Sequence, residues 1–297
     1  MPEQPHTYAG NPLDRGEAIR RDEADIETLA ESSQARFLPF HKLKVAATDG
    51  QLVWCDKEEI KALKPEQTIF LGIDDDTPHF AVATSSDSLE YSDCRAIAAS
   101  LANAETGIVA QARAQLDWHQ RNPFCAQCGN PTRAARGGQI RRCDICDRHT
   151  FPRTDPVAIM LIVDEPGGDR CLLGQSQGFM ANTNFYSALA GFLDQGESLE
   201  EAVRREVREE SGVIVGDVHY HSSQPWPFPS QLMIGCHGIA SDTRIEIDEV
   251  EMADVSWFSR DEVIAALAED NSELRVPGPM AIAHHLIRSW AAGEVTI

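Results

Sequence analysis

Three glutamates in the middle of the chain have the type and spacing of cation ligands. Glu206, Glu209 and Glu210 lie in residues 191–213, GFLDQGESLEEAVRREVREESGV. On a helix, Glu206 and Glu210 are about 40° apart and share a side with the apolar Val203, while Glu209 lies at the edge of that side. Buried carboxylates are costly unless something compensates them, and a hard divalent cation takes oxygen ligands grouped in this way. The pattern therefore favours a cation site over a partly exposed helix of imperfect amphipathicity.

Capping residues predict the helix that must carry these acids. Ser198 is followed three residues later by Glu201, which makes a capping box, and Gly212 supplies a left-handed stop. The helix is therefore expected between these caps, with an apolar stripe along one side. The charges on its other side suggest i,i+4 pairs of a solvated face, Glu200 with Arg204 and Glu201 with Arg205.

The same stretch fits a pattern of fixed positions, G-x5-E-x7-R-E-U-x-E-E-x-G-U, in which U is aliphatic. The matching residues are Gly191, Glu197, Arg205, Glu206, Val207, Glu209, Glu210, Gly212 and Val213. This pattern is the signature of the Nudix hydrolases, which the chain therefore resembles. That family cleaves nucleoside diphosphates linked to another group and uses Mg²⁺ or Mn²⁺, so the resemblance implies a metal-dependent hydrolase.

The resemblance also implies roles for single residues. Glu206 and Glu210 would bind Mg²⁺ or Mn²⁺ together with the carbonyl of Ala190 and with Glu251, six residues before Trp257. Without the resemblance, Glu251 is one of several acids in a polar stretch and is expected to be solvated.

The implied catalytic set comprises Glu197, Arg205, Glu206, Glu209 and Glu210. Arg205 is expected to pair with a carboxylate of the signature and orient it, and Glu197 is expected to act likewise. The general base stays open among Glu209, Glu210 and a later acid.

Composition limits the classes of protein to consider. At 297 residues with 42% hydrophobic residues, the chain can form two or three domains with real cores. A net charge of −21 argues against a broad nucleic-acid or anionic-membrane footprint. No apolar run is long enough to span a membrane, and the polar N-terminus carries no secretory signal. A cytoplasmic protein is therefore expected.

Four of the eight cysteines have zinc-ligand spacing, Cys125-x2-Cys128-x14-Cys143-x2-Cys146. In a chain without a secretion signal this spacing favours metal over disulfides or free thiols. Four thiolates leave no open coordination position, so the Zn²⁺ would be structural. Nearby basic residues leave nucleic-acid binding as a second interpretation, which the acidity of the whole chain disfavours: Arg133, Arg136, Arg141, Arg142 and Arg148.

The pattern of apolar runs and turns predicts four regions. They are a flexible arm (1–33) with one helix around 19–29, an N-terminal α/β domain (34–120), a zinc ribbon (121–153) and a catalytic domain (154–297). The last region reads as mixed strands with helices on both sides, which suits an α/β/α sandwich. The expected class is α+β, with a Nudix α/β/α sandwich preceded by the ribbon and the small domain.

Residues 223–229, SQPWPFP, alternate three prolines with two aromatics. Such a segment is no interior strand. It either lines a flat pocket for a base or plugs the core with its aromatic rings. After a Nudix signature, and with a four-cysteine ribbon, this segment resembles the NADH pyrophosphatase branch of the superfamily. That branch cleaves NADH or NAD to nicotinamide mononucleotide and AMP, is associated with removing NAD caps from RNA, and is typically homodimeric.

The resemblance implies a substrate-binding set of Gln224, Pro225, Trp226, Pro227, Phe228, Pro229, Ser230, Gln231, Glu251 and Ala283. Phe192 and Phe151 are candidates to stack on a base, and Arg95 aligns with a substrate-contacting arginine. Two departures from the branch could tune substrate preference: Ser230 with Gln231 after the last proline, and Phe151 where tyrosine is common.

Two other functions remain to be weighed. One is a broader dinucleotide or ADP-ribose pyrophosphatase, and the other is a non-catalytic zinc-ribbon nucleotide sensor. The complete set of acids in the signature disfavours the sensor.

Overall fold

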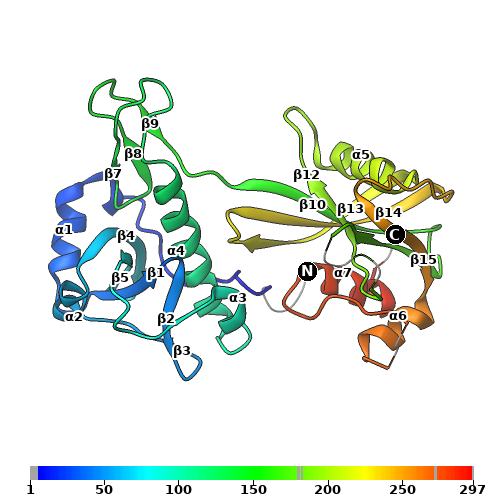
Figure 1. Cartoon of the computed structure of the whole chain (residues 1–297), viewed down its shortest axis with the longest axis horizontal. Helices are drawn as coiled ribbons and strands as arrows, with labels where there is room; N and C mark the ends of the chain where they lie inside the picture. The colour runs from blue at the N-terminus through cyan, green and yellow to red at the C-terminus, as the bar shows by residue number, and fades with distance from the viewer. Residues whose placement is uncertain (1–5, 179–180, 182, 271–272, 296–297) are drawn as a thin grey trace. The chain divides into compact units, whose positions relative to one another are not determined.

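The computed structural model describes residues 6–178, 181, 183–270 and 273–295 (Figure 1). These residues form two compact units. The N-terminal unit comprises residues 7–154 and 225–230, and the catalytic unit comprises residues 155–224 and 231–297 together with His6. None of the helices in the described ranges is both long enough and apolar enough to cross a membrane.

The catalytic unit is built on one mixed sheet. Its strands are β10 (Asp155–Val163), β11 (Arg170–Ser176), β12 (Leu189–Phe192), β13 (Ile214–Trp226), β14 (Gln231–Asp242) and β15 (Met252–Ser259). They run in the order β13-β14-β10-β11-β15, with β12 also paired to β10. The central strand β10 is parallel to β14 and antiparallel to β11 and β12.

Helices cover both faces of this sheet, as Figure 1 shows. Alternate residues of β10 point to opposite faces, and all are apolar from 157 to 163. Met160 packs in one core with α5 (Leu199–Ser211), and Leu161 packs in the other with α6 (Arg260–Leu267) and α7 (Ile282–Ala291). The expected α/β/α sandwich with a mixed sheet is confirmed.

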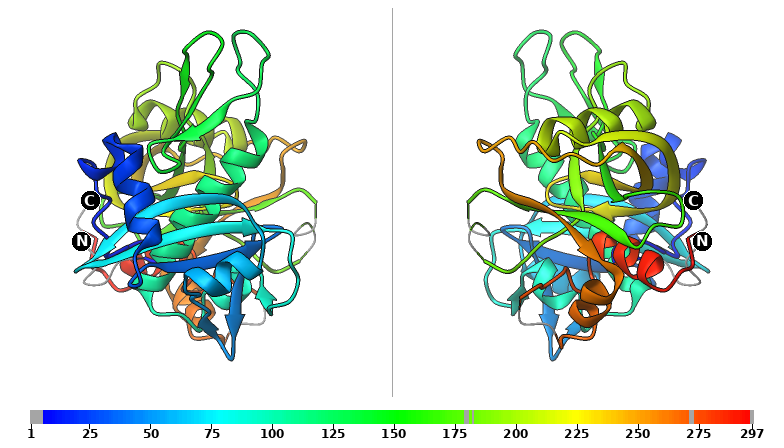
Figure 2. Two further views of the ribbon diagram at one scale, coloured as in Figure 1. Left: turned by 90° about the vertical axis from the view of Figure 1, so that its left-hand side faces the viewer. Right: turned by 90° about the vertical axis from the view of Figure 1, so that its right-hand side faces the viewer.

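The N-terminal unit has a second mixed sheet, in the order β3-β2-β1-β5-β4 with β6 on β2. Its strands are β1 (Arg36–His41), β2 (Lys44–Thr48), β3 (Gln51–Leu52), β4 (Pro65–Asp74), β5 (Thr77–Thr84) and β6 (Tyr91–Ser92). Its helices are η1 (Ile19–Arg21), α1 (Glu23–Glu31), α2 (Lys57–Ala62), α3 (Cys94–Ile97) and α4 (Asn103–Arg121). The helix α4 packs on one face and α1 on the other (Figure 2).

The first residues of this unit differ from the loosely ordered arm that their polar composition suggests. Tyr8 and Leu13 are buried, and the Tyr8 hydroxyl donates to the carbonyl of Cys94 at 3.0 Å. Asp14 pairs with Ile73 through two backbone hydrogen bonds of 2.9 and 2.8 Å. Because these contacts join residues that are far apart in the chain, hydrophobic periodicity carries no sign of them.

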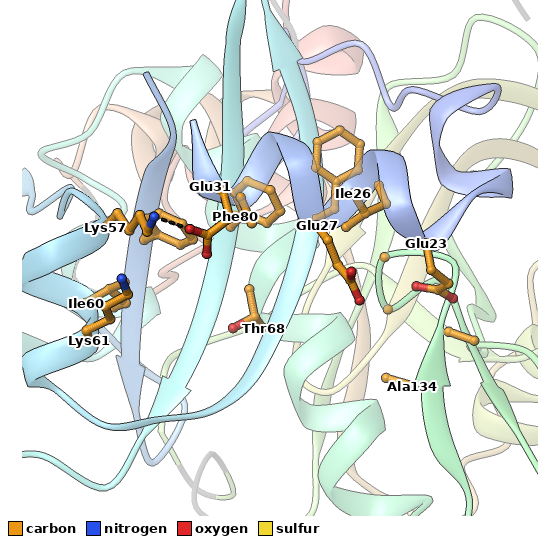
Figure 3. A pocket seen from close by; sticks show the side chains of 16 residues that line it. Glu23, Ile26, Glu27, Glu31, Lys57, Ile60, Lys61, Thr68, Phe80 and Ala134 are labelled. Atoms are coloured by element: carbon orange, nitrogen blue, oxygen red, sulfur yellow. Dashed lines mark hydrogen bonds and ion pairs between the residues drawn. The ribbon is translucent and has the colours of Figure 1, made fainter. Parts of the chain in front are cut away.

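A hollow of about 330 Å³ lies beside α1 (Figure 3). Glu23, Glu27 and Glu31 line one side of it. Glu31 forms an ion pair with Lys57, and Glu23 accepts the backbone N–H of Arg136 at 2.6 Å. These contacts tie both ends of α1 to neighbouring elements. The hollow contains none of the residues that the sequence singles out for catalysis.

Four histidines of the catalytic unit form a cluster in which two of them contact the hydroxyl of Ser222. His6 Nε2 and His221 Nδ1 lie 2.8 and 2.7 Å from Ser222 Oγ. The ring of His6 is 4.5 Å from that of His285, and the ring of His221 is 5.1 Å from that of His237. Burial lowers the pKa of His6 and of His221 to about 4, with neighbouring histidines adding to the effect, and lowers the pKa of His237 and His285 as well.

This cluster predicts a loss of stability in mild acid. A histidine with a pKa below its unfolded value stabilises the fold fully above pH ~6.5, and that stability is lost as the pH falls toward 4. Between pH 7 and pH 5, His6 is expected to contribute a loss of about 1–2 kcal/mol. His219, His284 and Arg288 are further basic groups beside the cluster, and none of them offsets this loss.

The test compares urea unfolding of the wild-type protein and His6→Gln at pH 7 and pH 5. The variant should lose less stability between the two pH values. Effects on zinc binding are common to both proteins and cancel in the comparison. An equal loss in both proteins would show that His6 does not carry the dependence.

Candidate active site

The helix α5 has the boundaries that its caps predict. Ser198 Oγ accepts the backbone N–H of Glu201 and the Glu201 carboxylate accepts that of Ser198, so the capping box is formed. Gly212 ends the helix in the left-handed region at φ 75°, where glycine carries no penalty. Val203 and Val207 are fully buried against the sheet. The helix is therefore fixed at both ends and along one side.

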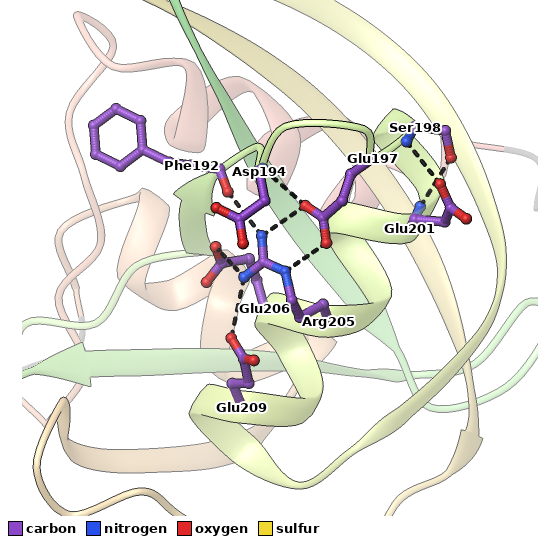
Figure 4. Close-up of polar contacts among 8 residues, drawn as sticks. All are labelled: Phe192, Asp194, Glu197, Ser198, Glu201, Arg205, Glu206 and Glu209. Carbon is purple, nitrogen blue, oxygen red and sulfur yellow. Dashed lines mark hydrogen bonds and ion pairs between the residues drawn. The ribbon is translucent and has the colours of Figure 1, made fainter.

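Arg205 ties α5 to the loop that precedes it (Figure 4). Its Nε and Nη2 donate to the two oxygens of Glu197 at 2.6 and 2.8 Å. Nη2 also donates to the Phe192 carbonyl at 2.8 Å, and Nη1 donates to Glu206 at 2.8 Å and Glu209 at 3.1 Å. Glu197 is held so firmly by Arg205 and by the backbone that its pKa falls to about 2. Loop and helix thus form one rigid piece.

The expected i,i+4 pairs on the outer face of α5 are not formed. Among the described side chains, the ion pairs of Arg205 go to Glu197, Glu206 and Glu209 instead. Arg204 donates from Nε and Nη2 to the carbonyl of Gly216 at 3.0 and 2.8 Å. Long arginine side chains reach tertiary partners that a helical wheel does not contain.

Glu210 is a buried carboxylate with three other acidic side chains nearby. It is 8% exposed, and its Oε2 is buried without a hydrogen-bond partner among the described residues. Burial, followed by the charges of Glu206, Glu251 and Glu209, raises its pKa to about 8. The pKa of Glu206 is also raised, mainly by burial. The hydrogen bond and charge of Arg205 partly offset the rise in the pKa of Glu206, whereas no cationic side chain offsets the rise in the pKa of Glu210.

This arrangement fits a divalent cation. A buried carboxylate oxygen without a partner, crowded by three more carboxylates, is the environment that such a cation compensates. Glu251 ends the loop before β15 and lies close enough to shift the pKa of both Glu206 and Glu210. Ala190 lies on β12, paired with Ile159 of the central strand.

Gly191 makes room for this group of acids. It follows Ala190 on β12, and a Cβ at its position would collide with the carboxylate of Glu206. The first fixed position of the signature is therefore a glycine, because the carboxylate of Glu206 occupies the space that a side chain at position 191 would need.

Gln224 and Ala283 are buried and contact the elements around α7. Gln224 is fully buried, donates to the Met280 carbonyl at 2.8 Å and accepts the Ile282 N–H at 2.9 Å, which caps the start of α7. Ala283 is 2% exposed in the core under α7. Their side chains therefore hold α7 in place, and contact of these two residues with substrate stays a prediction. Phe192 is 54% exposed beside the acids and free to stack.

The segment 225–230 packs within the N-terminal unit. Trp226 and Phe228 meet edge to face at 5.5 Å, and Tyr8 contacts both rings edge-on at 5.8 and 5.6 Å. The guanidinium of Arg95 lies 4.2 Å from the Phe228 ring and 5.6 Å from the Trp226 ring. Of the two open interpretations, the structure favours rings held by packing, with Phe228 against the core. Pro227 is buried, whereas Pro225, Pro229, Ser230 and Gln231 are partly exposed.

Two residues around this segment carry no signal in the sequence. Arg113 donates to the Pro227 carbonyl and lies 4.6 Å from the Phe228 ring, and Tyr8 comes from the polar N-terminal stretch. Phe151, which follows the zinc ribbon, is 62% exposed in the same unit.

The four cysteines of the ribbon form a tight cluster of metal-ligating side chains, with all four sulfur atoms within 4.8 Å of one another. Three sulfur–sulfur distances are 3.5–3.6 Å, close to the edge of about 3.8 Å that a tetrahedron with 2.3 Å zinc–sulfur bonds has. The donor set fits one structural Zn²⁺.

Both halves of the cluster have the same local geometry. The N–H groups of Cys125 and Cys143 each donate to the carbonyl five residues later, at 2.8 and 2.9 Å. In each, the fourth residue on, Gly129 or Asp147, has a positive φ. The ribbon sheet, β7 (Arg133–Ala135), β8 (Ile140–Arg142) and β9 (His149–Thr150), carries this pair of knuckles.

Three family models match the chain. They are described as a NADH pyrophosphatase-like rudimentary NUDIX domain (residues 34–118), a NADH pyrophosphatase zinc ribbon domain (120–151) and a NUDIX domain (153–276). The chain belongs to the Nudix hydrolases. Its particular place among them is given by the ribbon and the rudimentary domain, which are both described as parts of NADH pyrophosphatases.

Named relatives are similar over much of the chain. A NAD-capped RNA hydrolase NudC from Mycobacterium bovis is 36% identical over 266 residues, which cover 84% of each chain. A NAD-capped RNA hydrolase NUDT12 from Macaca fascicularis is 47% identical over 195 residues, and Nudix hydrolase 19 from Arabidopsis thaliana is 40% identical over 229 residues. The matched part is 63% of this chain in both cases, but only 42% and 52% of those longer relatives.

Proposed function

We propose that the protein hydrolyses the pyrophosphate bond of NADH or NAD to nicotinamide mononucleotide, reduced or oxidised, and AMP, and that it also removes NAD caps from RNA. The observation that carries the proposal is Glu210, a buried residue of the Nudix helix that lies among three other acids and has an oxygen without a partner among the described residues. The named activities of the similar proteins support the substrate class. A cytoplasmic location and a homodimer complete the proposal and rest on the family resemblance.

In this proposal Glu206, Glu210 and Glu251 hold Mg²⁺ or Mn²⁺ with the carbonyl of Ala190. At this site the cation would supply charge neutralisation for the phosphate oxygens and a lower pKa for the attacking water. Arg205 holds Glu206 in place by a hydrogen bond of 2.8 Å.

Glu209 is exposed, is bonded to Arg205 through one oxygen only, and is not a metal ligand in this proposal. It is therefore the acid left to accept the proton of the water. The structural Zn²⁺ of the ribbon takes no part in this chemistry, because four cysteine ligands leave it no open position.

The decisive assay incubates the purified protein with NADH and Mn²⁺ and separates the products by chromatography. Equal amounts of AMP and reduced mononucleotide are expected, and none without a divalent cation. Much faster cleavage of ADP-ribose than of NADH would favour the broader pyrophosphatase. Tight nucleotide binding without turnover would instead identify a sensor.

Gly191→Ala is expected to lower NADH turnover by about 100-fold, since displacing a catalytic group by about 1 Å costs that much. The new methyl group would push the Glu206 carboxylate away from Arg205. The measurement is kcat at saturating Mn²⁺, with circular dichroism to show that the fold persists. Gly278→Ala is the matched control, because a Cβ there meets nothing within 4 Å. Equal activities of the two variants would contradict the role of Gly191.

A further inference from the structure

A hollow of about 530 Å³ lies on the outer side of α5. It is lined by Arg204, Arg205, Arg208, Glu209, Ile214 and Val215. In a chain with a net charge of −21, three arginines around one hollow are a local reversal of charge. The hollow is therefore a candidate anion site, and Arg204 and Arg208 in its lining have no role in the catalysis proposed above.

The three arginines differ in how far their donors are occupied. Arg205 is bonded to three carboxylates and a carbonyl. Arg204 donates from Nε and Nη2 to the neutral Gly216 carbonyl, and its charge also helps to lower the pKa of Glu201. Arg208 is exposed and forms no ion pair among the described residues. Within the described part of the chain, neither Arg204 nor Arg208 forms an ion pair, so both guanidinium groups line the hollow without a carboxylate in direct contact.

The ordinary explanation accounts for only part of this arrangement. Arg208 lies in the last turn of α5, where a cation complements the helix dipole. However, Arg204 stands four residues earlier, and like charges at that spacing destabilise a helix by a few tenths of a kcal/mol. An anion between them would relieve this repulsion, and the fork of an arginine fits phosphate oxygens.

We propose that this hollow binds a phosphodiester of single-stranded RNA, next to the pyrophosphate that is cleaved. The inference deepens the proposed function and rests on it. Glu209 lines the hollow and also belongs to the group of acids, so the hollow begins beside the reacting phosphates. NADH has no phosphate beyond its pyrophosphate, whereas a capped RNA continues from the adenosine as a chain of phosphodiesters. The 40% exposed Ile214 gives the hollow an apolar wall for a ribose or base.

The first test measures binding of a fluorescein-labelled, uncapped 12-nucleotide RNA to the zinc-loaded full chain by anisotropy. Uncapped RNA has no pyrophosphate to cleave, so the result does not depend on turnover. Arg208→Gln is expected to weaken binding about threefold to tenfold and to reduce the slope of log K against log salt by about 0.7, the loss of one phosphate contact. Arg288→Gln is the matched control, since Arg288 is an exposed arginine in the last turn of α7.

The second test compares kinetics on NADH and on NAD-capped RNA. Arg208→Gln should raise KM for the capped RNA and leave both constants for NADH unchanged. Arg208→Lys should recover part of the RNA affinity. The inference is overturned if the wild-type protein does not bind the RNA, if both glutamine variants weaken binding equally, or if KM for NADH rises as much as KM for capped RNA. Failure of the wild-type protein to cleave NADH would instead reject the proposed function, whatever the RNA binding.

Discussion

Glu210→Gln is expected to lower NADH turnover by at least about 100-fold, because a metal-binding interaction in catalysis is worth several kcal/mol. Glutamine keeps the volume of the buried side chain but removes the charge that would hold the cation. Burial, together with the charges of Glu206, Glu251 and Glu209, raises the pKa of this side chain to about 8 in the absence of a cation. The measurement is kcat for NADH over a range of Mn²⁺ concentrations.

For the same variant we also expect a change in thermal stability that does not depend on turnover. Without divalent cation, Glu210→Gln should be at least as stable as the wild-type protein, because one of four crowded acids is neutralised. Added Mn²⁺ should raise the Tm of the wild-type protein, since a ligand that binds only the folded state stabilises it, and should raise that of the variant less. Glu200→Gln, on the exposed side of the same helix, is the control and should behave as wild type. Turnover near the wild-type rate in Glu210→Gln would refute the assignment.

Cys125→Ser is expected to abolish zinc binding and to unfold the ribbon. Structural zinc sites contribute on the order of 10 kcal/mol in isolated peptides, and strands as short as β7, β8 and β9 cannot replace that. Metal analysis should find one zinc per chain in the wild-type protein and none in the variant. Amide exchange should lose its protection across the three strands.

Cys94→Ala separates loss of metal from loss of a buried cysteine. Cys94 is 1% exposed in the core of the same unit and lies outside the cluster of four. This control should lose some stability and keep its zinc. A Cys125→Ser protein that matches wild type in Tm, both with and without a chelator, would remove the structural role of the metal.

Local signals in the sequence were enough to predict the elements that carry the acids. Ser198 and Gly212 define the ends of α5 by hydrogen bonds and a backbone angle that depend on few neighbours. The unbroken apolar run of β10 predicts a strand covered on both faces. These features follow from residues a few positions apart, which is why periodicity and capping rules detect them.

Contacts between distant residues were beyond those rules. Arg205 has an acid four residues before it, yet it bonds to Glu197 in the preceding loop, because loop and helix fold onto each other. Tyr8 looks like part of a polar arm, but it is buried against Trp226 and Phe228, more than two hundred residues later. Gln224 belongs to a conspicuous segment, and nothing in that segment reveals that it caps α7.

The hydrogen bonds by which Arg205 joins the loop to α5 restrict which mutations the gene can accept. One guanidinium meets both oxygens of Glu197 and the Phe192 carbonyl while it holds Glu206 on the helix. Lysine, with a single nitrogen, cannot span these partners. An added or deleted residue between Gly191 and Glu197 would displace Glu197 from the guanidinium group of Arg205. Proteins that descend from this one should therefore tolerate amino-acid substitutions in that loop far better than insertions or deletions.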